Sequence, residues 1–272
     1  MENSQYTKVS CGDMINRLVS KNYMSVTFPL SHKHFCLAAE SFLDFLTLPD
    51  DVKNSFYHKI DPRDRGSAVG YVLKARHKGD LDNKEYFHYH PIAEEEFLSS
   101  LANPDPRIHV FFGYARTIHY LASLCLSEIL RELEGRFPGL RTQFFPEKGH
   151  PHFYLRFLKY ATSTTGDFLA AGHYDRGGCT LALSESAPGL RIGKDDRSLE
   201  EVVHTDKTAL FFPAVHFDAM TSPELRPAWH DVIQKQEDRY SDSVARWAVV
   251  FFADAVEFAG RTKLEEAHTP KR

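Results

Sequence analysis

Hydrophobic and polar positions alternate differently in the two halves of this chain. Up to about residue 133, apolar residues recur every three or four positions, which is the spacing of one helix face. This spacing predicts helices over Cys11–Lys21, His32–Leu46 and Pro106–Leu133. A short apolar run between the first two predicts a strand over Met24–Phe28. The first half of the chain is therefore expected to be rich in helices.

Beyond Pro151 the pattern changes to short apolar runs bounded by turn residues. Strands are predicted over six segments: Phe153–Tyr160, Thr180–Ser184, Leu190–Ile192, Ala209–Phe212, His230–Ile233 and Arg246–Phe252. Short strands at this spacing are typical of a sandwich or a jelly roll. We therefore expect a mainly β protein with flanking helices (α+β), in which a sandwich or jelly-roll core follows an N-terminal helical region.

Two segments show little periodicity. The segment His58–Asp82 is rich in Asp, Arg, Gly and Lys, and we expect it to be an irregular loop. The charged tail after Gly260 is expected to be frayed or to form a short helix.

Composition limits the class of protein further. With 272 residues, 42% of them apolar, the chain can bury one large core. We expect a single domain over residues 1–272, helix-rich over 1–150 and with its jelly-roll core over about 151–260. The net charge of −4 offers no basic surface for nucleic acid, and no apolar run is long enough for a membrane span. The first residues lack a signal-peptide pattern and the four cysteines lack metal-type spacing, which favours a cytoplasmic location.

Three His-x-Asp triplets lie in the second half of the chain, at residues 173–175, 204–206 and 216–218. A non-haem Fe(II) site of the oxygenase type uses two imidazoles and one carboxylate, and it leaves positions open for co-substrate and oxygen. On a strand, residues i and i+2 point to the same side, so such a triplet supplies two ligands together. The third ligand must come from a distant strand, followed by a cation that can bind a dicarboxylate.

Only the first triplet has both of these partners downstream. His230 lies 55 residues after Asp175, and Arg246 follows another 16 residues later at the start of a predicted strand. For the other two triplets, the only histidine at a comparable distance is His268, close to the end of the chain. Those two triplets are expected to be structural or exposed. The sequence therefore predicts a metal site formed by His173, Asp175 and His230.

Several short motifs follow one another in a fixed order. Residues 46–53 read LTLPDDVK, residues 70–71 read GY, residues 82–85 read DNKE and residues 155–160 read LRFLKY. Residues 172–175 read GHYD, residues 179–183 read CTLAL, residues 229–232 read WHDV and residues 246–248 read RWA. In order and spacing, these motifs resemble those of the iron(II)/2-oxoglutarate-dependent oxygenases of the isopenicillin-N-synthase-like family, over nearly the whole chain.

The resemblance implies an enzyme that uses Fe(II), 2-oxoglutarate and molecular oxygen to oxidise a C–H bond, most often by hydroxylation. A small polar metabolite or natural-product intermediate is the implied substrate, and a monomer or small homo-oligomer the implied assembly, without nucleic-acid or membrane partners. The implied fold has a double-stranded β-helix (jelly-roll) core after the N-terminal helical region, and the implied metal ligands are His173, Asp175 and His230. Arg246 would bind the far carboxylate of 2-oxoglutarate. Tyr160 either contacts this co-substrate or is a core residue.

Two departures from the family motifs concern the co-substrate. The family's arginine is followed two residues later by serine, whereas this chain has Ala248 and so lacks one hydroxyl donor. A hydrogen bond to a charged group is worth about 1.5–3 kcal/mol. Arg239-Tyr240-Ser241 fits the R-x-S motif literally, but only Arg246 is followed at the family's offset by a phenylalanine pair, Phe251-Phe252. Arg246 is therefore the preferred candidate.

Other functions fit parts of the sequence. Without the serine, a 2-oxoglutarate-independent Fe(II) oxidase that desaturates or cyclises its substrate stays open, as does a non-catalytic metal-binding β-helix protein. His88-Tyr89-His90 with Glu94 matches the first half of a cupin metal motif, but no second half follows. We expect these histidines at ordinary surface positions or near the substrate mouth, and Glu94 in a solvated helix.

Overall fold

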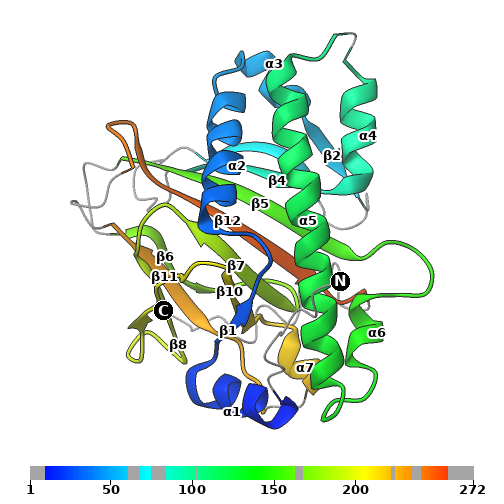
Figure 1. The fold of residues 1–272 in the computed structure, drawn as a ribbon, viewed down its shortest axis with the longest axis vertical. Coiled ribbons are helices and arrows are strands. Elements are labelled where there is room, and N and C mark those ends of the chain that lie inside the picture. Colours follow the sequence, from blue (N-terminus) through cyan, green and yellow to red (C-terminus); the bar gives the residue numbers. More distant parts are fainter. Residues whose placement is uncertain are drawn as a thin grey trace, which may run out of the picture.

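Antiparallel strands and helices make up the fold, which is seen in a computed structural model (Figure 1). The structure describes residues 10–60, 68–74, 84–101, 103–162, 168–221, 224–234 and 240–256. The helices are α1 (Cys11–Lys21), α2 (His32–Phe45), α3 (Asp50–Ser55), α4 (Pro91–Ser99), α5 (Pro106–Leu133), α6 (Leu140–Phe144) and α7 (Phe217–Thr221).

The strands form a large and a small sheet. In the large sheet the order is β1 (Met24–Thr27), β10 (Thr208–Pro213), β7 (Cys179–Glu185), β12 (Val244–Asp254), β5 (His152–Ala161), β4 (Lys84–Tyr89), β3 (Ala68–Lys74) and β2 (Tyr57–Lys59). In the small sheet the order is β6 (Phe168–Tyr174), β11 (Trp229–Ile233), β8 (Leu190–Gly193) and β9 (Glu200–Glu201). Two facing antiparallel sheets of this kind are a jelly-roll core.

The large sheet is buried on both faces because its central strands carry apolar side chains on both sides. Every residue of β7 is buried. On β5, the Phe157 ring packs against Phe42 of α2 and Phe111 of α5, with centroids 5.7 and 5.1 Å apart. The adjacent Leu158 and Tyr160 belong instead to a second core between the two sheets. Alternation along each strand thus separates a helix-facing core from an inner core.

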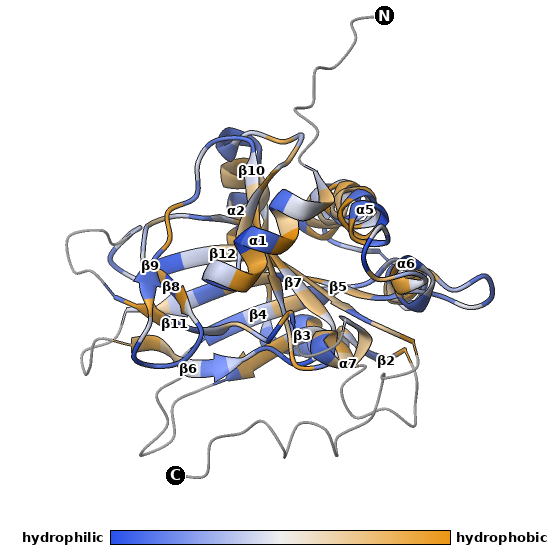
Figure 2. Cartoon of the chain, turned by 90° about the horizontal axis from the view of Figure 1, so that it is seen from below, coloured by the Kyte–Doolittle hydropathy of each residue, from blue (hydrophilic) through white to orange (hydrophobic). Residues whose placement is uncertain are grey.

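The inner core lies between the two sheets. Figure 2 shows α5 and the small sheet on opposite sides of β7 and β12. Side chains from both sheets build the inner core: Leu158, Tyr160, Leu169, Ala182, Ile192, Leu210, Phe212 and Val232. The helices therefore stabilise the outer face of the large sheet and leave its inner face to the small sheet.

The predicted elements in both halves are confirmed. The helix bounds of α1 and α5 agree with those expected from the apolar spacing, and α2 ends one residue earlier than expected. The six strands predicted beyond Pro151 are β5, β7, β8, β10, β11 and β12. The mainly β architecture with helices around a jelly-roll core is likewise confirmed.

The expectation of an irregular loop over His58–Asp82 is wrong where the structure describes it. Residues Ala68–Lys74 form β3, which pairs with β2 on one side and β4 on the other. Gly70 hides this strand in the sequence, because glycine usually weakens one. Here Gly70 has a φ of 108°, and a Cβ would lie 2.0 Å from the carbonyl oxygen of Phe56. Close backbone approach therefore requires glycine at this position.

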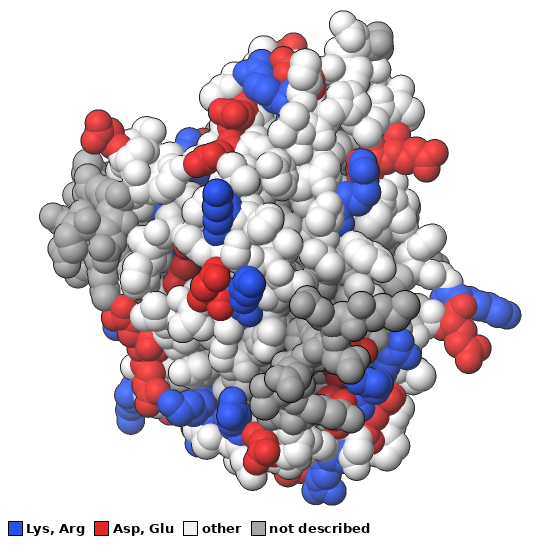
Figure 3. All heavy atoms as spheres, in the orientation of Figure 1, with Lys and Arg blue, Asp and Glu red and all other residues white. Residues whose placement is uncertain are grey.

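Two further expectations concern the tail and the surface. The tail after Gly260 lies outside the described residues. Among those described, no helix combines the length and the apolar character that crossing a bilayer requires. On the face seen in Figure 3, basic and acidic side chains are interspersed.

Candidate metal centre and its pocket

Strand pairing brings the three candidate ligands together. His173 lies near the end of β6 and Asp175 directly follows that strand, while His230 lies on β11 in register with His173. Gly172 permits this close packing, because a Cβ there would lie 2.8 Å from the indole of Trp229. The Gly172–Trp229 contact thus supports the register that sets the two histidines side by side.

The three side chains converge on one point. Asp175 Oδ1 lies 3.6 Å from His173 Nε2 and 3.5 Å from His230 Nε2, and the two imidazole centroids are 4.4 Å apart. An ion about 2.1 Å from three ligands on one octahedral face would set them about 3 Å apart. A contraction of about half an ångström would therefore close the site. Within the described residues, this is the only group of three His, Cys, Asp or Glu side chains so arranged.

Backbone carbonyls fix which ring nitrogen faces the centre. His173 Nδ1 lies 2.8 Å from the oxygen of Ala171, and His230 Nδ1 lies 3.3 Å from that of Ala228. Because a carbonyl only accepts, each Nδ1 carries a hydrogen, which leaves each Nε2 facing the centre as the potential ligand atom. Contacts of this kind orient histidines that bind metals. The donor set therefore fits Fe(II).

Asp175 is held ionised and oriented. Thr180 Oγ1 donates to Asp175 Oδ2 at 2.7 Å, which leaves Oδ1 to face the histidines. Burial alone would raise the pKa of Asp175, but His230 and His173 outweigh it and hold the pKa well below its ordinary value. Gly177, at a φ of 95°, belongs to the tight turn that returns the chain from Asp175 to Thr180.

Thr180→Val is expected to weaken Fe(II) binding by about 10–100-fold, the usual effect of losing a contact that orients a ligand. The variant keeps the side-chain shape but loses the hydroxyl that aims Asp175. Anaerobic equilibrium dialysis against Fe(II) measures the affinity, and Thr180→Ser, which keeps the hydroxyl, is the matched control. Equal affinity in Thr180→Val and the wild type would contradict this role.

A pocket continues from the centre into the space between the sheets. It is lined by the three candidate ligands and also by Tyr160, Arg246 and Ala248. Arg246 and Ala248 share one face of β12, and Tyr160 lies opposite Arg246 on β5, its ring centroid 6.0 Å from the guanidinium. The structure thus places both predicted co-substrate residues in the pocket. The rival Arg239 lies outside the described residues.

Arg246 is buried and has an acidic partner within the chain. Its guanidinium forms an ion pair with Glu185 at the end of β7, and its Nε donates to the Ala187 oxygen at 3.0 Å. Burial lowers the pKa of Arg246 to about 10, so the side chain stays cationic at neutral pH. Sequence reasoning missed Glu185. The available signal in the sequence was a carboxylate directly after the predicted strand Thr180–Ser184.

Two more cationic side chains line the pocket, Lys84 and Arg156. The Arg156 guanidinium lies between the rings of Tyr86 and Phe252, at 4.8 and 4.4 Å from their centroids. Its Nε donates to His88 Nε2. Burial first, and Arg156 next, hold the pKa of His88 well below its ordinary value. His88 is therefore a neutral acceptor that orients Arg156.

The other two His-x-Asp triplets are structural, as expected. His204 Nε2 donates to the Ala182 oxygen at 2.9 Å, and His216 Nδ1 lies 3.0 Å from an Asp254 oxygen. Neither belongs to a group of three potential ligands within the described part of the chain. His204 does, however, line the pocket beside Glu185.

The expectations for His90 and Glu94 are wrong. His90 is buried rather than exposed, and its Nδ1 accepts from the Ile92 backbone N–H at the start of α4. Glu94 is also buried, because both Arg116 and Tyr89 reach its carboxylate. These residues stabilise the junction between β4 and α4. They join no group of three potential metal ligands in the described residues.

Acid is expected to destabilise the protein through His119, a buried histidine of α5. Burial lowers the pKa of His119 to about 4, whereas an unfolded histidine titrates near 6.5. Between these values the unfolded chain binds more protons, so stability falls as the pH drops, by about 2 kcal/mol at pH 5 for this residue. His119→Gln can still donate to the Phe153 oxygen. Denaturant unfolding at pH 7 and pH 5 should show a loss about 2 kcal/mol smaller in the variant, and identical losses would contradict this account.

Comparisons with known proteins support the fold. No family model matches the chain, and no curated protein matches it. Among solved structures, that of full-length Neurospora crassa T7H in complex with alpha-KG is similar at a TM-score of 0.67, with 16% identity over 90% of this chain and 79% of that one. Dioxygenase for auxin oxidation 1 from Arabidopsis thaliana, in a 2-oxoglutarate binary complex, is similar at 0.64, with 17% identity over 92% and 90%.

A third similar structure, from Caulobacter crescentus, is provisionally assigned to the 2OG-Fe(II) oxygenase family. Its TM-score is 0.67, with 18% identity over 90% of this chain and 81% of that one. At these identities the likeness concerns the fold alone. The chain thus has the jelly-roll fold of 2-oxoglutarate and iron oxygenases, with a two-histidine, one-carboxylate cluster inside it.

Proposed function

We propose that this protein is an Fe(II)/2-oxoglutarate-dependent oxygenase that oxidises a C–H bond of a small polar substrate, with hydroxylation as the default outcome. One observation carries the proposal. Two imidazole Nε2 atoms and one carboxylate oxygen, each oriented by a second contact, face one point at the mouth of an inner pocket. Two imidazoles and one carboxylate on one face are the ligand set of non-haem Fe(II) oxygenases.

Each pocket residue has a distinct part in this proposal. His173, Asp175 and His230 would hold Fe(II), which supplies the activation of oxygen when it is bound. Arg246 would bind the far carboxylate of 2-oxoglutarate, because a planar guanidinium suits two parallel hydrogen bonds to a carboxylate. Tyr160 packs beside that guanidinium and would help to position it.

The shape of the pocket also bears on access and substrate. The His173 side chain is 46% exposed whereas that of His230 is 7% exposed, so the centre is open to solvent on the His173 side. Substrate would approach from there. Lys84 and Arg156 add cationic groups to the apolar lining, which favours a polar substrate over a purely hydrocarbon one.

Anaerobic addition of Fe(II) and then 2-oxoglutarate tests the proposal. If the keto acid chelates the metal, a weak visible charge-transfer band appears, and admission of oxygen then consumes 2-oxoglutarate and releases succinate. Succinate release across a library of polar metabolites would identify the substrate. Bound iron without a band, or a band without succinate for any compound, would count against the proposal.

A 2-oxoglutarate-independent Fe(II) oxidase is the second candidate. It is favoured by Ala248, which removes a hydroxyl donor, and by the ion pair that already engages Arg246. For an oxidase, iron binds, no band forms with 2-oxoglutarate, and oxygen is consumed with substrate alone.

A further inference from the structure

Arg246, the cation predicted to bind the co-substrate, is already paired with a carboxylate of the chain itself, that of Glu185. Glu185 Oε2 forms the ion pair with the Arg246 guanidinium, and both side chains are buried, at 6% and 4% exposure. A buried cation is seldom left without a partner, because desolvating an unpaired charge costs several kcal/mol. Glu185 thus already neutralises the Arg246 guanidinium, as the far carboxylate of 2-oxoglutarate would otherwise do.

Ala248, which stands where the family motif has serine, lies next to this ion pair. Glu185 lies directly opposite Ala248 in the pairing of β7 with β12. Both Glu185 and Ala248 line the pocket together with Arg246. A far carboxylate entering here therefore gains no hydroxyl from residue 248 and must share or take over the guanidinium.

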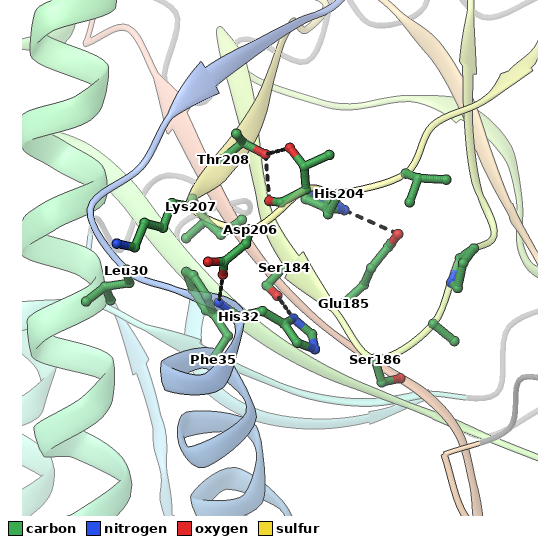
Figure 4. Close-up of a pocket in the computed structure, with 15 residues that line it drawn as sticks. Leu30, His32, Phe35, Ser184, Glu185, Ser186, His204, Asp206, Lys207 and Thr208 are labelled. Carbon is green, nitrogen blue, oxygen red and sulfur yellow. Dashed lines mark hydrogen bonds and ion pairs between the residues drawn. The ribbon is translucent and has the colours of Figure 1, made fainter. Parts of the chain in front are cut away.

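Glu185 also lies beside His204, through the carboxylate oxygen that is not paired with Arg246. Its Oε1 lies 3.2 Å from His204 Nδ1. Figure 4 shows these two side chains facing each other at a neighbouring cavity, which is also lined by Leu30, His32 and Ser186. Glu185 and His204 line both cavities and so form part of the wall between them. There is thus space for the carboxylate of Glu185 when it leaves Arg246.

We propose that Glu185 competes with the co-substrate's far carboxylate for Arg246 and thereby sets which 2-oxo acids the site accepts. The inference rests on the proposed function. It assigns Glu185 as a specificity-determining residue. 2-Oxo acids that carry a second carboxylate must displace Glu185, whereas those without one leave the Glu185–Arg246 pair intact.

Glu185→Gln tests the proposal with two probes, 2-oxoglutarate and 2-oxobutanoate, which lacks the far carboxylate. The amide keeps the shape and can still hydrogen-bond Arg246, but it removes the competing charge. The dissociation constant of each keto acid is measured by anaerobic titration of the Fe(II)-loaded protein, following the charge-transfer band. We expect 2-oxoglutarate to bind at least about tenfold more tightly to the variant and 2-oxobutanoate to change less than about twofold. Glu200→Gln, at an exposed position of the small sheet, is the matched control and should change neither value.

The outcomes separate this inference from the function on which it rests. Equal 2-oxoglutarate affinity in wild type and Glu185→Gln, or the same gain for both keto acids, would overturn the role of Glu185 and leave the oxygenase proposal in place. No band with either keto acid in any variant that binds iron would overturn both. A melting curve shows whether Glu185→Gln is folded. If it is not, Glu185→Asp, which keeps the charge but retracts it by one methylene, should show a smaller gain for 2-oxoglutarate alone, and its absence would equally refute the proposal.

Discussion

Asp175→Ala is expected to weaken Fe(II) binding by more than about 100-fold and to abolish iron-dependent turnover. Loss of a residue that merely orients a ligand costs about 10–100-fold, and loss of the ligand itself costs more. Asp175 is also the only carboxylate of the cluster, so His173 and His230 would be left to hold a divalent cation without a compensating charge. Anaerobic dialysis against Fe(II), followed by a metal assay, measures the effect.

A second cluster variant, His173→Ala, is compared with the same substitution of a histidine outside the cluster. His34 is exposed on α2, and its Nδ1 lies 2.8 Å from the hydroxyl of Ser31. His34→Ala should bind one iron per chain as the wild type does, whereas His173→Ala should behave like Asp175→Ala. Because the His173 side chain is half-exposed, its loss should not unfold the protein. Tight iron binding by both cluster variants would show that the metal lies elsewhere.

Arg246→Met is expected to destabilise the fold by about 3–5 kcal/mol, the usual cost of removing one partner of a buried ion pair. Arg246 is 3% exposed, and its loss leaves the Glu185 carboxylate buried beside an apolar side chain. The effect on 2-oxoglutarate should be separate and also large, because Arg246 is the side chain proposed to bind its far carboxylate. Urea unfolding of the metal-free protein gives the stability change.

A second substitution distinguishes charge burial from lost packing. Arg246→Met combined with Glu185→Leu removes both charges, and apolar replacement of a whole buried pair is often neutral or stabilising. The double variant should therefore recover most of the lost stability while its 2-oxoglutarate affinity stays low. A double variant no more stable than Arg246→Met alone would contradict the assignment of the ion pair.

The candidate ligands could be predicted because the signal for His173 and Asp175 is local and the order of the motifs downstream points to His230. His173 and Asp175 lie two residues apart, where strand geometry puts both side chains on one side. His230 and Arg246 each stand at the start of an apolar run, and both runs are strands in the structure. The long amphipathic pattern of α5 was equally informative, since it repeats over many turns.

The partner of Arg246 could not be predicted, because it depends on strand register. β7 pairs with β12 through an irregularity between Val249 and Val250, which shifts the residues that face each other. This shift places Glu185 opposite Ala248, within reach of Arg246. Such a bulge leaves no simple mark in the sequence. The strand β3 was missed for a different reason: Gly70 serves a close backbone approach there but reads as a break.

A crystal structure of the protein loaded anaerobically with Fe(II), with anomalous diffraction at the iron edge, tests the central claim most directly. The account predicts one strong anomalous peak per chain, about 2.0–2.3 Å from His173 Nε2, His230 Nε2 and an Asp175 carboxylate oxygen, as expected for nitrogen and oxygen ligands. A peak bound by other residues, or no peak in a protein whose three side chains lie as described, would contradict it.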